Sequence, residues 1–234
     1  MFAGECSLKE TCWVTILICC SSLLHAAEPT LRNLNVRGLQ IGGTTTITVE
    51  GDDLGKAPRL LLPLRAKQKL KPGNTDKQAS FDVVFENEVT PGYYHLRIVT
   101  DDGVSLPLVI AVDRLRQMPF AASVDQQPVA LHGSVNGSST VATKFQGKAG
   151  QKVMIEVEAQ RLGGKLRPIM HLVGPKKLQL AWAWGTPALF GDARLEATLP
   201  EDGAYAIAIH DAEYAAACVS FHTHTEGIVK RNGT

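Results

Sequence analysis

At residues 152–159 the chain reads Lys152-Val153-Met154-Ile155-Glu156-Val157-Glu158-Ala159, in which apolar and other residues alternate almost strictly. A period of two places successive side chains on opposite faces of an extended strand. The same pattern recurs at residues 44–50 and 79–84, and Gly, Pro or Asp turns separate the stretches. No long segment after residue 27 has the apolar spacing of an amphipathic helix. These patterns predict an all-β protein built from antiparallel sandwiches.

The strand pattern falls into two blocks, each large enough for a hydrophobic core of its own. The first block covers residues 28–113 and the second covers residues 128–217. The mixed stretch between them, residues 114–127, has the composition of a linker. Residues 218–234 show no clear closing pattern, and we expect an irregular tail there. The prediction is therefore two tandem β-sandwich domains.

Residues 1–27 have the features of an export signal. Their apolar stretch, residues 13–24, ends at His25-Ala26-Ala27 before Glu28-Pro29. It is shorter than the roughly 20 residues that span a bilayer, and small residues follow it as at a cleavage site. We expect cleavage after Ala26 or Ala27, no stable membrane span in the mature chain, and a location in the cell envelope (periplasm or extracellular) or in the medium. A lipoprotein signal and a retained N-terminal anchor are the less favoured alternatives.

Charge and cysteine content exclude two further features, a nucleic-acid-binding surface and an internal disulfide. The chain has 24 Lys and Arg against 23 Asp and Glu. Because a nucleic-acid surface usually needs a basic excess, we expect no nucleic-acid partner. Four of the five cysteines lie in the expected signal, at positions 6, 12, 19 and 20. The mature chain would then hold one thiol, Cys218, and no internal disulfide.

Each block places a Gly turn shortly before a Tyr that opens a strand. The two stretches read Thr90-Pro91-Gly92-Tyr93-Tyr94 and Pro200-Glu201-Asp202-Gly203-Ala204-Tyr205. In β-sandwiches such a Tyr can bury its ring while its hydroxyl bonds back to the backbone of the turn, which is the tyrosine corner. We expect Tyr205, and one of Tyr93 and Tyr94, to be structural corner residues rather than ligand contacts. Tyr94 is the one we assign.

Three stretches of the second block carry a family resemblance. They are Gly147-Lys148-Ala149-Gly150-Gln151, residues 159–168, and Leu199-Pro200-Glu201-Asp202-Gly203-Ala204-Tyr205, preceded by Leu131-His132-Gly133-Ser134-Val135. In order and spacing this block, about residues 128–217, resembles the bacterial pre-peptidase C-terminal domain. The resemblance implies a jelly-roll-like, non-catalytic sandwich of the kind appended to secreted proteases and other exported proteins. Some members bind calcium or assist carbohydrate or protein binding, but no calcium-ligand pattern can be matched here residue by residue.

The first block looks, more loosely, like the Ig-like module that often precedes this domain in large exported bacterial proteins. The likeness rests on residues 42–51 and 91–107. Members of the family usually continue beyond the last strand into further repeats or a closing strand. The resemblance therefore suggests either a fragment of a larger secreted protein or an irregular last strand.

No constellation suited to catalysis is visible. A nucleophile needs a base beside it and a third group that holds the base, and no Gly-x-Ser-x-Gly elbow occurs. His132-Gly133-Ser134 lies in an expected strand, where adjacent side chains point to opposite faces. We therefore expect a non-enzyme, with no catalytic residue and no cofactor-binding residue.

One histidine group is a weak metal candidate. His222-Thr223-His224 places both imidazoles on one face of an extended segment, with His210-Asp211 and Cys218 upstream. Zinc needs three or four ligands around it, and a solvated tail that contains histidines is the favoured interpretation. Asp52, Asp53, Asp101 and Asp102 lie in turns, where Asp is common for backbone reasons, whereas calcium needs six to eight oxygens. No metal ligand is assigned, and calcium stays open only through the resemblance.

Trp182 and Trp184 are the one pair with the chemistry of a ligand platform. Their spacing of two puts both indoles on one face of a strand. That face could be exposed or could face the core, and because Trp buries well the core is favoured. The predicted function is an exported, non-catalytic structural or interaction module for an extracellular protein or polysaccharide. The alternatives are a carbohydrate-binding module that uses Trp182 and Trp184, and an accessory remnant of a secreted peptidase.

Overall fold

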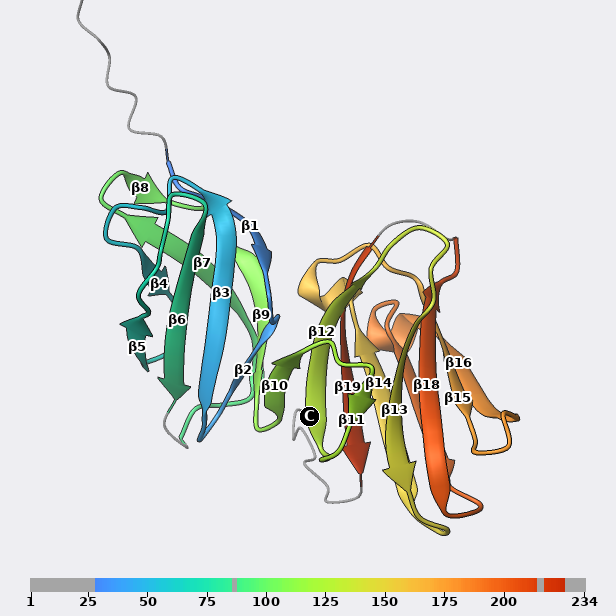
Figure 1. Ribbon diagram of the computed structural model, residues 1–234. Coiled ribbons are helices and arrows are strands. Elements are labelled where there is room, and N and C mark those ends of the chain that lie inside the picture. Colours follow the sequence, from blue (N-terminus) through green and yellow to red (C-terminus); the bar gives the residue numbers. More distant parts are fainter. Residues whose placement is uncertain (1–27, 86–87, 214–216, 226–234) are drawn as a thin grey trace, which may run out of the picture.

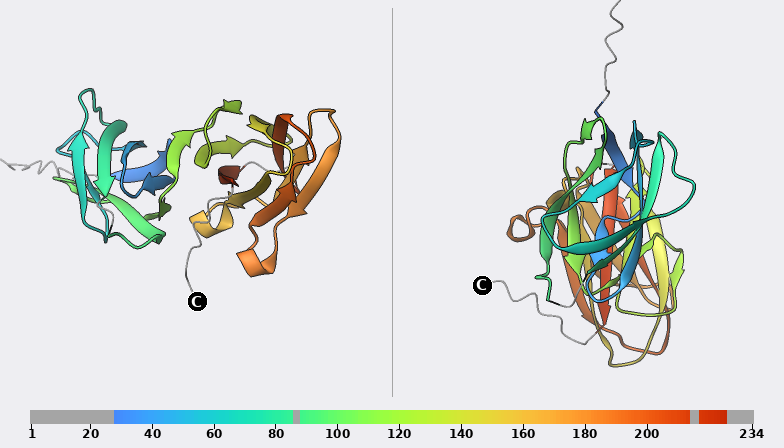
Figure 2. Two further views of the ribbon diagram at one scale, coloured as in Figure 1. Left: turned by 90° about the horizontal axis from the view of Figure 1, so that it is seen from below. Right: turned by 90° about the vertical axis from the view of Figure 1, so that its left-hand side faces the viewer.

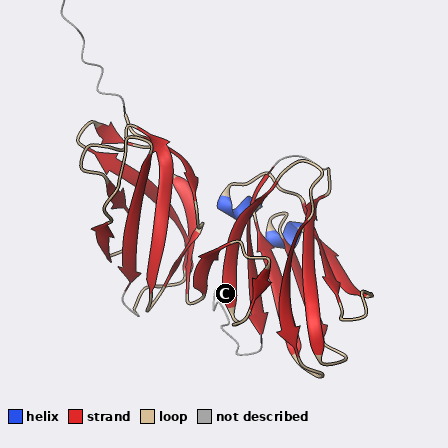
Figure 3. Cartoon of the chain, in the orientation of Figure 1, coloured by secondary structure: helices blue, strands red, loops and turns tan. Residues whose placement is uncertain are grey.

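The computed structural model describes residues 28–85, 88–213 and 217–225, the last of these ranges through its backbone. The expected export signal lies outside these residues. Almost all regular structure is strand, and the described helices are two short 3-10 turns, η1 (Gln160–Leu162) and η2 (Pro187–Leu189) (Figure 3). Buried apolar side chains form two clusters, one within residues 34–112 and one within residues 124–209. The prediction of an all-β chain with β-sandwich architecture is confirmed. In the described part of the chain, no helix is long and apolar enough to cross a membrane.

The first domain is a sandwich of two sheets (Figure 1). One sheet has the order β1 (Thr30–Leu34), β3 (Thr44–Asp52), β6 (Gln78–Phe85) and β5 (Ala66–Leu70). The other has the order β2 (Gly38–Gln40), β9 (Leu108–Asp113), β7 (Gly92–Thr100) and β4 (Arg59–Leu61), with β8 (Gly103–Val104) paired to β7. The pairing of β2 with β9 is parallel. The two sheets pack their apolar faces together around the first buried cluster, as in a β-sandwich.

Strand β3 shows why the sequence folds this way. Thr45, Ile47 and Val49 are buried, and the residues between them face outward. β-branched side chains such as these suit a half-buried, pleated surface. One edge between the sheets is closed by Gln68, which accepts a hydrogen bond from the backbone N–H of Leu60 and donates one to the Leu60 carbonyl, each at 2.8 Å. The Gln68 amide therefore joins β5 to β4 in the way that a backbone amide would.

The second domain is also a two-sheet sandwich, and the chain enters it through β10 (Figure 2). One sheet has the order β10 (Arg116–Pro119), β12 (Val129–Val135), β19 (Ala217–Thr225), β14 (Lys152–Glu158) and β17 (Ala193–Thr198). The other has the order β11 (Ser123–Val124), β13 (Val141–Gly147), β18 (Gly203–Asp211), β15 (Pro168–Val173) and β16 (Gln179–Trp184). Strand β16 is thus an edge strand, and it lies on the side of this domain away from the first domain (Figure 1).

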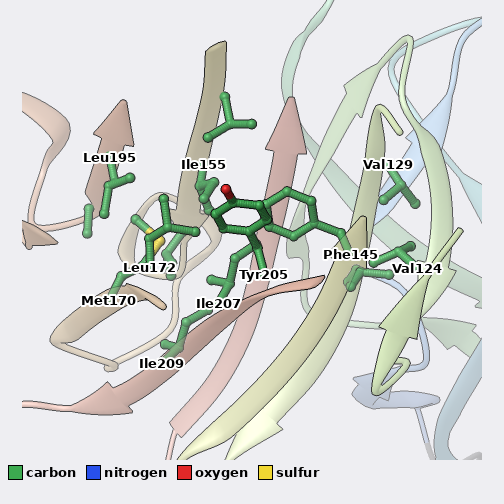
Figure 4. Close-up of a cluster of buried hydrophobic side chains, with 14 of the residues drawn as sticks. Val124, Val129, Phe145, Ile155, Met170, Leu172, Leu195, Tyr205, Ile207 and Ile209 are labelled. Atoms are coloured by element: carbon green, nitrogen blue, oxygen red, sulfur yellow. The ribbon is translucent and has the colours of Figure 1, made fainter. Parts of the chain in front are cut away.

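Tyr205 lies at the centre of the second core (Figure 4). Its ring is fully buried and stacks on Phe145, with ring centroids 5.6 Å apart. Its hydroxyl donates a 2.5 Å hydrogen bond to the carbonyl of Glu201. In the first domain the Tyr94 hydroxyl donates at 2.9 Å to the carbonyl of Thr90, also four residues upstream. Both tyrosines have the geometry of a tyrosine corner.

Two expected boundaries differ from the structure. The expected linker, residues 114–127, contains β10 and β11, which pair in parallel with β12 and β13 and add an edge strand to each sheet of the second domain. These strands are too short for a period of two to stand out in the sequence. The expected irregular tail is wrong over residues 217–225, because β19 lies between β12 and β14 and pairs antiparallel with both. Its alternation, Val219-Ser220-Phe221-His222, is present in the sequence but short.

Candidate functional site

Large apolar side chains gather on the surface around β16. In the described part of the chain eight large hydrophobic residues are exposed, and five of them lie between residues 178 and 190. We call these five residues the tryptophan strip: Leu178, Leu180, Trp182, Trp184 and Phe190. Isolated exposed hydrophobic residues are normal on a protein surface, but a local group of them marks an interaction site.

The two indoles are exposed, so the favoured expectation that they pack in the core is wrong. Trp182 is 53% exposed and Trp184 is 59% exposed. The core-facing positions of β16 are held by Ala181 and Ala183, which are partly buried and pack against the second core. Sequence alternation leaves open which of the two faces points inward, and size favours the Trp face. In the structure the alanine face points inward and the Trp face points to solvent.

The indoles meet at a right angle. Their centroids are 5.2 Å apart and their planes are perpendicular, so the edge of one ring points to the face of the other. Edge-to-face packing is a favourable arrangement of two aromatic rings. The pair therefore presents a corner with two walls and not a single flat surface.

Polar side chains lie next to this corner. His171 is the cross-strand neighbour of Trp182, and the Oε1 atom of Gln179 lies 2.7 Å from His171 Nδ1. The Nε2 atoms of His171 and His210 are 3.3 Å apart. His210 Nδ1 donates to the carbonyl of Asp211 at 3.1 Å, because a carbonyl oxygen only accepts.

Short side chains cover the sheet beyond the histidines. Ala204, Ala206 and Ala208 alternate with buried residues along β18 and face outward. Ala208 pairs with His171 on one side and with Ala142 of β13 on the other. The indoles and imidazoles therefore stand above a neighbouring surface of methyl groups.

The loop after β16, residues 185–192, is tightly closed. Thr186 N–H donates to the Asp192 carbonyl at 3.0 Å, and Gly191 N–H donates to the Thr186 carbonyl at 2.8 Å. The backbones of Gly185 and Gly191 touch, since a Cβ atom added at Gly185 would lie 2.1 Å from the Gly191 oxygen. Only glycine fits at position 185 without moving this backbone.

Asp192, at the end of that loop, belongs to a buried charge cluster. Its Oδ1 accepts hydrogen bonds from the N–H groups of Ala159 and Gln160, at 2.9 and 2.8 Å, and its Oδ2 accepts one from Arg161 Nε at 2.7 Å. Arg161 also forms ion pairs with Glu156 and Glu158. Since Arg161 is held by three carboxylates, it is the hub of the cluster.

The cluster shifts the ionisation of its members. Burial disfavours the charged form of Glu156, but the charge of Arg161 and the hydrogen bonds from Arg161 and Arg194 outweigh it, so the pKa of Glu156 lies below its ordinary value. Burial opposes the charge of Arg161 as well, yet the hydrogen bond to Asp192 and the charges of Glu158 and Glu156 raise its pKa further. Glu156 and Arg161 are therefore both held in their charged forms, as a buried ion pair requires.

The same cluster contacts the first domain. The Tyr93 hydroxyl donates a 2.6 Å hydrogen bond to Glu158, and the Arg161 guanidinium lies 5.8 Å from the centroid of the Tyr93 ring. A second bridge runs from the N–H of Arg37 to His132 Nδ1 at 3.0 Å. Because Nδ1 accepts, His132 Nε2 donates to Gln117 Oε1 at 2.7 Å. The sequence offers no local signal for this junction, because its partners are as many as 95 residues apart.

The structure does not bring catalytic groups together at the histidine considered from the sequence. His132 is buried and engaged by Arg37 and Gln117, and its place is in the junction between the domains. Within residues 28–85 and 88–213, no group of three or more His, Cys, Asp or Glu side chains is placed to hold a metal ion. The side chains of Cys218, His222 and His224 lie outside the described residues. In the Asp-rich turns, Arg32 pairs with Asp52 and Lys56 with Asp102.

Comparisons with known proteins identify similar folds at low similarity. No protein-family model matches the chain, and a search of curated proteins finds no match. Among solved structures, the pre-peptidase C-terminal domain of collagenase from Bacillus anthracis is 11% identical, with a TM-score of 0.37 over 45% of this chain and 95% of that domain. PliG from Aeromonas hydrophila, a periplasmic inhibitor of g-type lysozyme, is 16% identical, with a TM-score of 0.36 over 46% of this chain and 99% of that chain.

A third similar structure extends over both domains. SGBP-B from the Bacteroides ovatus mixed-linkage glucan utilization locus, solved in complex with a mixed-linkage heptasaccharide, is 10% identical, with a TM-score of 0.31 over 83% of this chain and 76% of that chain. At such identities and TM-scores the likenesses carry no conclusion about ligand or activity.

Proposed function

We propose that this protein is an exported, non-catalytic binding module that holds a soluble glycan chain on the tryptophan strip. The observation that carries the proposal is the exposure of Trp182 and Trp184, which meet at a right angle on an edge strand. Keeping two indoles in water forgoes the free energy that burial of a large aromatic side chain provides. A ligand that covers them would recover that free energy.

The geometry favours a single glycan chain over a crystalline polysaccharide. A pyranose ring has apolar C–H faces, which pack against flat aromatic faces through dispersion and the removal of water. One sugar ring can enter the corner between the indoles and contact both. A flat crystalline surface cannot lie against two perpendicular rings at once.

Polar neighbours supply hydrogen bonds for such a ligand. Gln179 and His171 lie beside Trp182, and amide and imidazole groups can each donate to and accept from sugar hydroxyls. Binding sites for small polar ligands combine an apolar surface with a few placed polar groups of this kind. The outward-facing residues of β15, β16 and β18 include no Asp or Glu, whereas glycoside hydrolysis uses a pair of carboxylates. This surface is therefore suited to hold a glycan and not to cleave one.

A protein ligand is the second candidate, and the leucines of the strip favour it. Leu178 and Leu180 are 64% and 39% exposed, and aliphatic groups have no flat face for a sugar. In the described part of the chain β16 pairs with β15 on one side only, so its other edge could accept a strand from a partner. Tryptophan is also enriched among the residues that dominate protein interfaces.

Binding of defined glycans to the purified protein tests the proposal. The probes are cello-, laminari- and chito-oligosaccharides of two to six units, followed by tryptophan fluorescence and calorimetry. We expect Trp182→Ala and Trp184→Ala each to weaken binding at least about tenfold, which corresponds to the loss of one good stacking contact. Leu106→Ala is the matched control, because Leu106 is 83% exposed but lies in the first domain. Absence of glycan binding, or binding that both Trp variants retain, would overturn the glycan assignment.

A further inference from the structure

We infer that Phe190 forms a third aromatic subsite next to the indoles, so that the strip takes an oligosaccharide of at least two sugar rings and not a single sugar. The inference rests on the proposed function and adds the length of its ligand. It is carried by the backbone conformation of Phe190 and by the architecture of the loop that holds it.

Phe190 has a backbone conformation that is unfavourable for its side chain. Its φ is 55° and its ψ is 34°, in the left-handed region at the end of η2. This position after a helical turn normally holds Gly or Asn, and a bulky residue there is a conformational outlier. Residues in such conformations gather at ligand sites, where the surrounding structure enforces them.

Burial of the Phe190 ring does not offset the cost of this backbone conformation. It is 75% exposed, which is the second highest exposure among the large hydrophobic residues that the structure describes. An exposed phenyl ring in a left-handed position is unfavourable on both counts in the free protein. Contact with a ligand would remove the ring from water and so contribute favourably to the free energy of binding.

The position of Phe190 is fixed by the base of its loop. Thr186 bonds to both Gly191 and Asp192, and Asp192 is fully buried under hydrogen bonds from the segment of η1. The Gln160 side chain also lies against Gly191. Phe190 is therefore presented from a closed, anchored loop, which lowers the entropy that a contact has to overcome.

The same loop places Phe190 at the Trp184 end of the strip. The backbones of Gly185 and Gly191 touch, and each glycine directly follows an aromatic residue, Trp184 and Phe190 respectively. The two aromatic residues consequently start from neighbouring points of the backbone. A chain that places one sugar in the indole corner can place the next sugar toward Phe190.

The test compares stability with affinity for ligands of different length. We expect Phe190→Gly to raise the melting temperature, because it relieves the left-handed conformation. We expect the same variant to weaken binding of disaccharide and hexasaccharide probes about tenfold, while it leaves the weaker binding of single-sugar methyl glycosides unchanged. Phe190→Tyr, which keeps an aromatic ring, should retain hexasaccharide affinity.

Each other outcome counts against a specific statement. If Phe190→Gly lowers the melting temperature and leaves hexasaccharide affinity intact, Phe190 is a structural residue and the inference is wrong. If the two Trp variants lose binding and Phe190→Gly does not, the subsite is wrong while the proposed function stands. If the wild-type protein binds none of the oligosaccharides, both are overturned.

Discussion

Tyr93 of the first domain and Glu158 of the second share a 2.6 Å hydrogen bond, although 65 residues separate them in the chain. Glu158 is buried and also lies within an ion pair of Arg161. The adjacent Tyr94 bonds only within its own domain, to Thr90. Tyr93 and Tyr94 therefore have different partners, because adjacent side chains of a strand point to opposite faces of the sheet. Tyr94 stabilises the first sandwich, and Tyr93 joins it to the second.

Tyr93→Phe tests this junction. The variant keeps the ring but removes the donor to a buried carboxylate, and a hydrogen bond to a charged group contributes about 1.5–3 kcal/mol. We expect scanning calorimetry to show a lower melting temperature for the second domain, since Glu158 belongs to it. Tyr94→Phe is the control and should affect the first domain alone. Identical thermograms for the two variants would contradict the assignment.

Arg161→Met should be the most destabilising single change in the charge cluster. It leaves Glu156, Glu158 and Asp192 buried without their shared cation, and breaking a buried ion network in this way costs about 3–5 kcal/mol. Arg194→Met is the matched control, because Arg194 contacts Glu156 alone in this cluster and its side chain is 41% exposed. Urea unfolding measures both. A loss for Arg161→Met no larger than for Arg194→Met would show that Arg161 is not the hub.

Acid should weaken the second domain through Glu156. The pKa of Glu156 in the folded protein lies below its ordinary value of 4.5, chiefly because Arg161 outweighs the cost of burial. A depressed pKa means that the ionised form stabilises the fold above the ordinary value, and that this contribution is lost as the pH falls through the folded value. We expect the free energy of unfolding to decrease below about pH 4.5.

Glu156→Gln identifies the source of that pH dependence. The variant should be less stable than the wild type at pH 7, since a charged partner of Arg161 and Arg194 is gone. Its stability should then decline less steeply on acidification. Parallel stability curves for variant and wild type between pH 7 and pH 3 would assign the acid sensitivity to other groups.

Two variants at Tyr205 distinguish the contribution of its hydroxyl hydrogen bond to stability from that of its ring packing. Tyr205→Phe removes the donor to the Glu201 carbonyl and keeps the stacking on Phe145, so we expect a loss of about 0.5–1.5 kcal/mol. Tyr205→Ala also opens a cavity in the second core and should cost about 3–5 kcal/mol. Chemical denaturation distinguishes the two. Equal losses would mean that the hydroxyl, and not the ring, carries the contribution of Tyr205.

Local patterns in the sequence predict much of this fold. The period of two locates strands such as β3 and β14, and the Gly turns before Tyr94 and Tyr205 indicate the two corners. Strands as short as β10 and β11 are not predicted from the sequence, because two to four residues are too few to show a period of two. Strand β19 is not predicted either, because its central position in the sheet depends on pairing with β12 and β14, which are distant in sequence.

The candidate site is predicted only in part. The spacing of Trp182 and Trp184 shows that they share a face, but whether that face is exposed depends on which side of the sheet packs against the second sheet. Phe190 has no sequence signal, since its importance comes from a left-handed backbone that the following glycine helps to accommodate. The junction residues Tyr93 and His132 likewise become visible only when two domains are placed together.

The position of β19 sets the order in which the second domain can form. Its neighbours β12 and β14 are made long before it, and each would present a bare edge until residues 217–225 arrive between them. As the polypeptide leaves the ribosome, the first domain can close early, while the second has to wait for the last strand of the sheet. A chaperone that shields exposed strand edges during synthesis would therefore act mainly on the second domain.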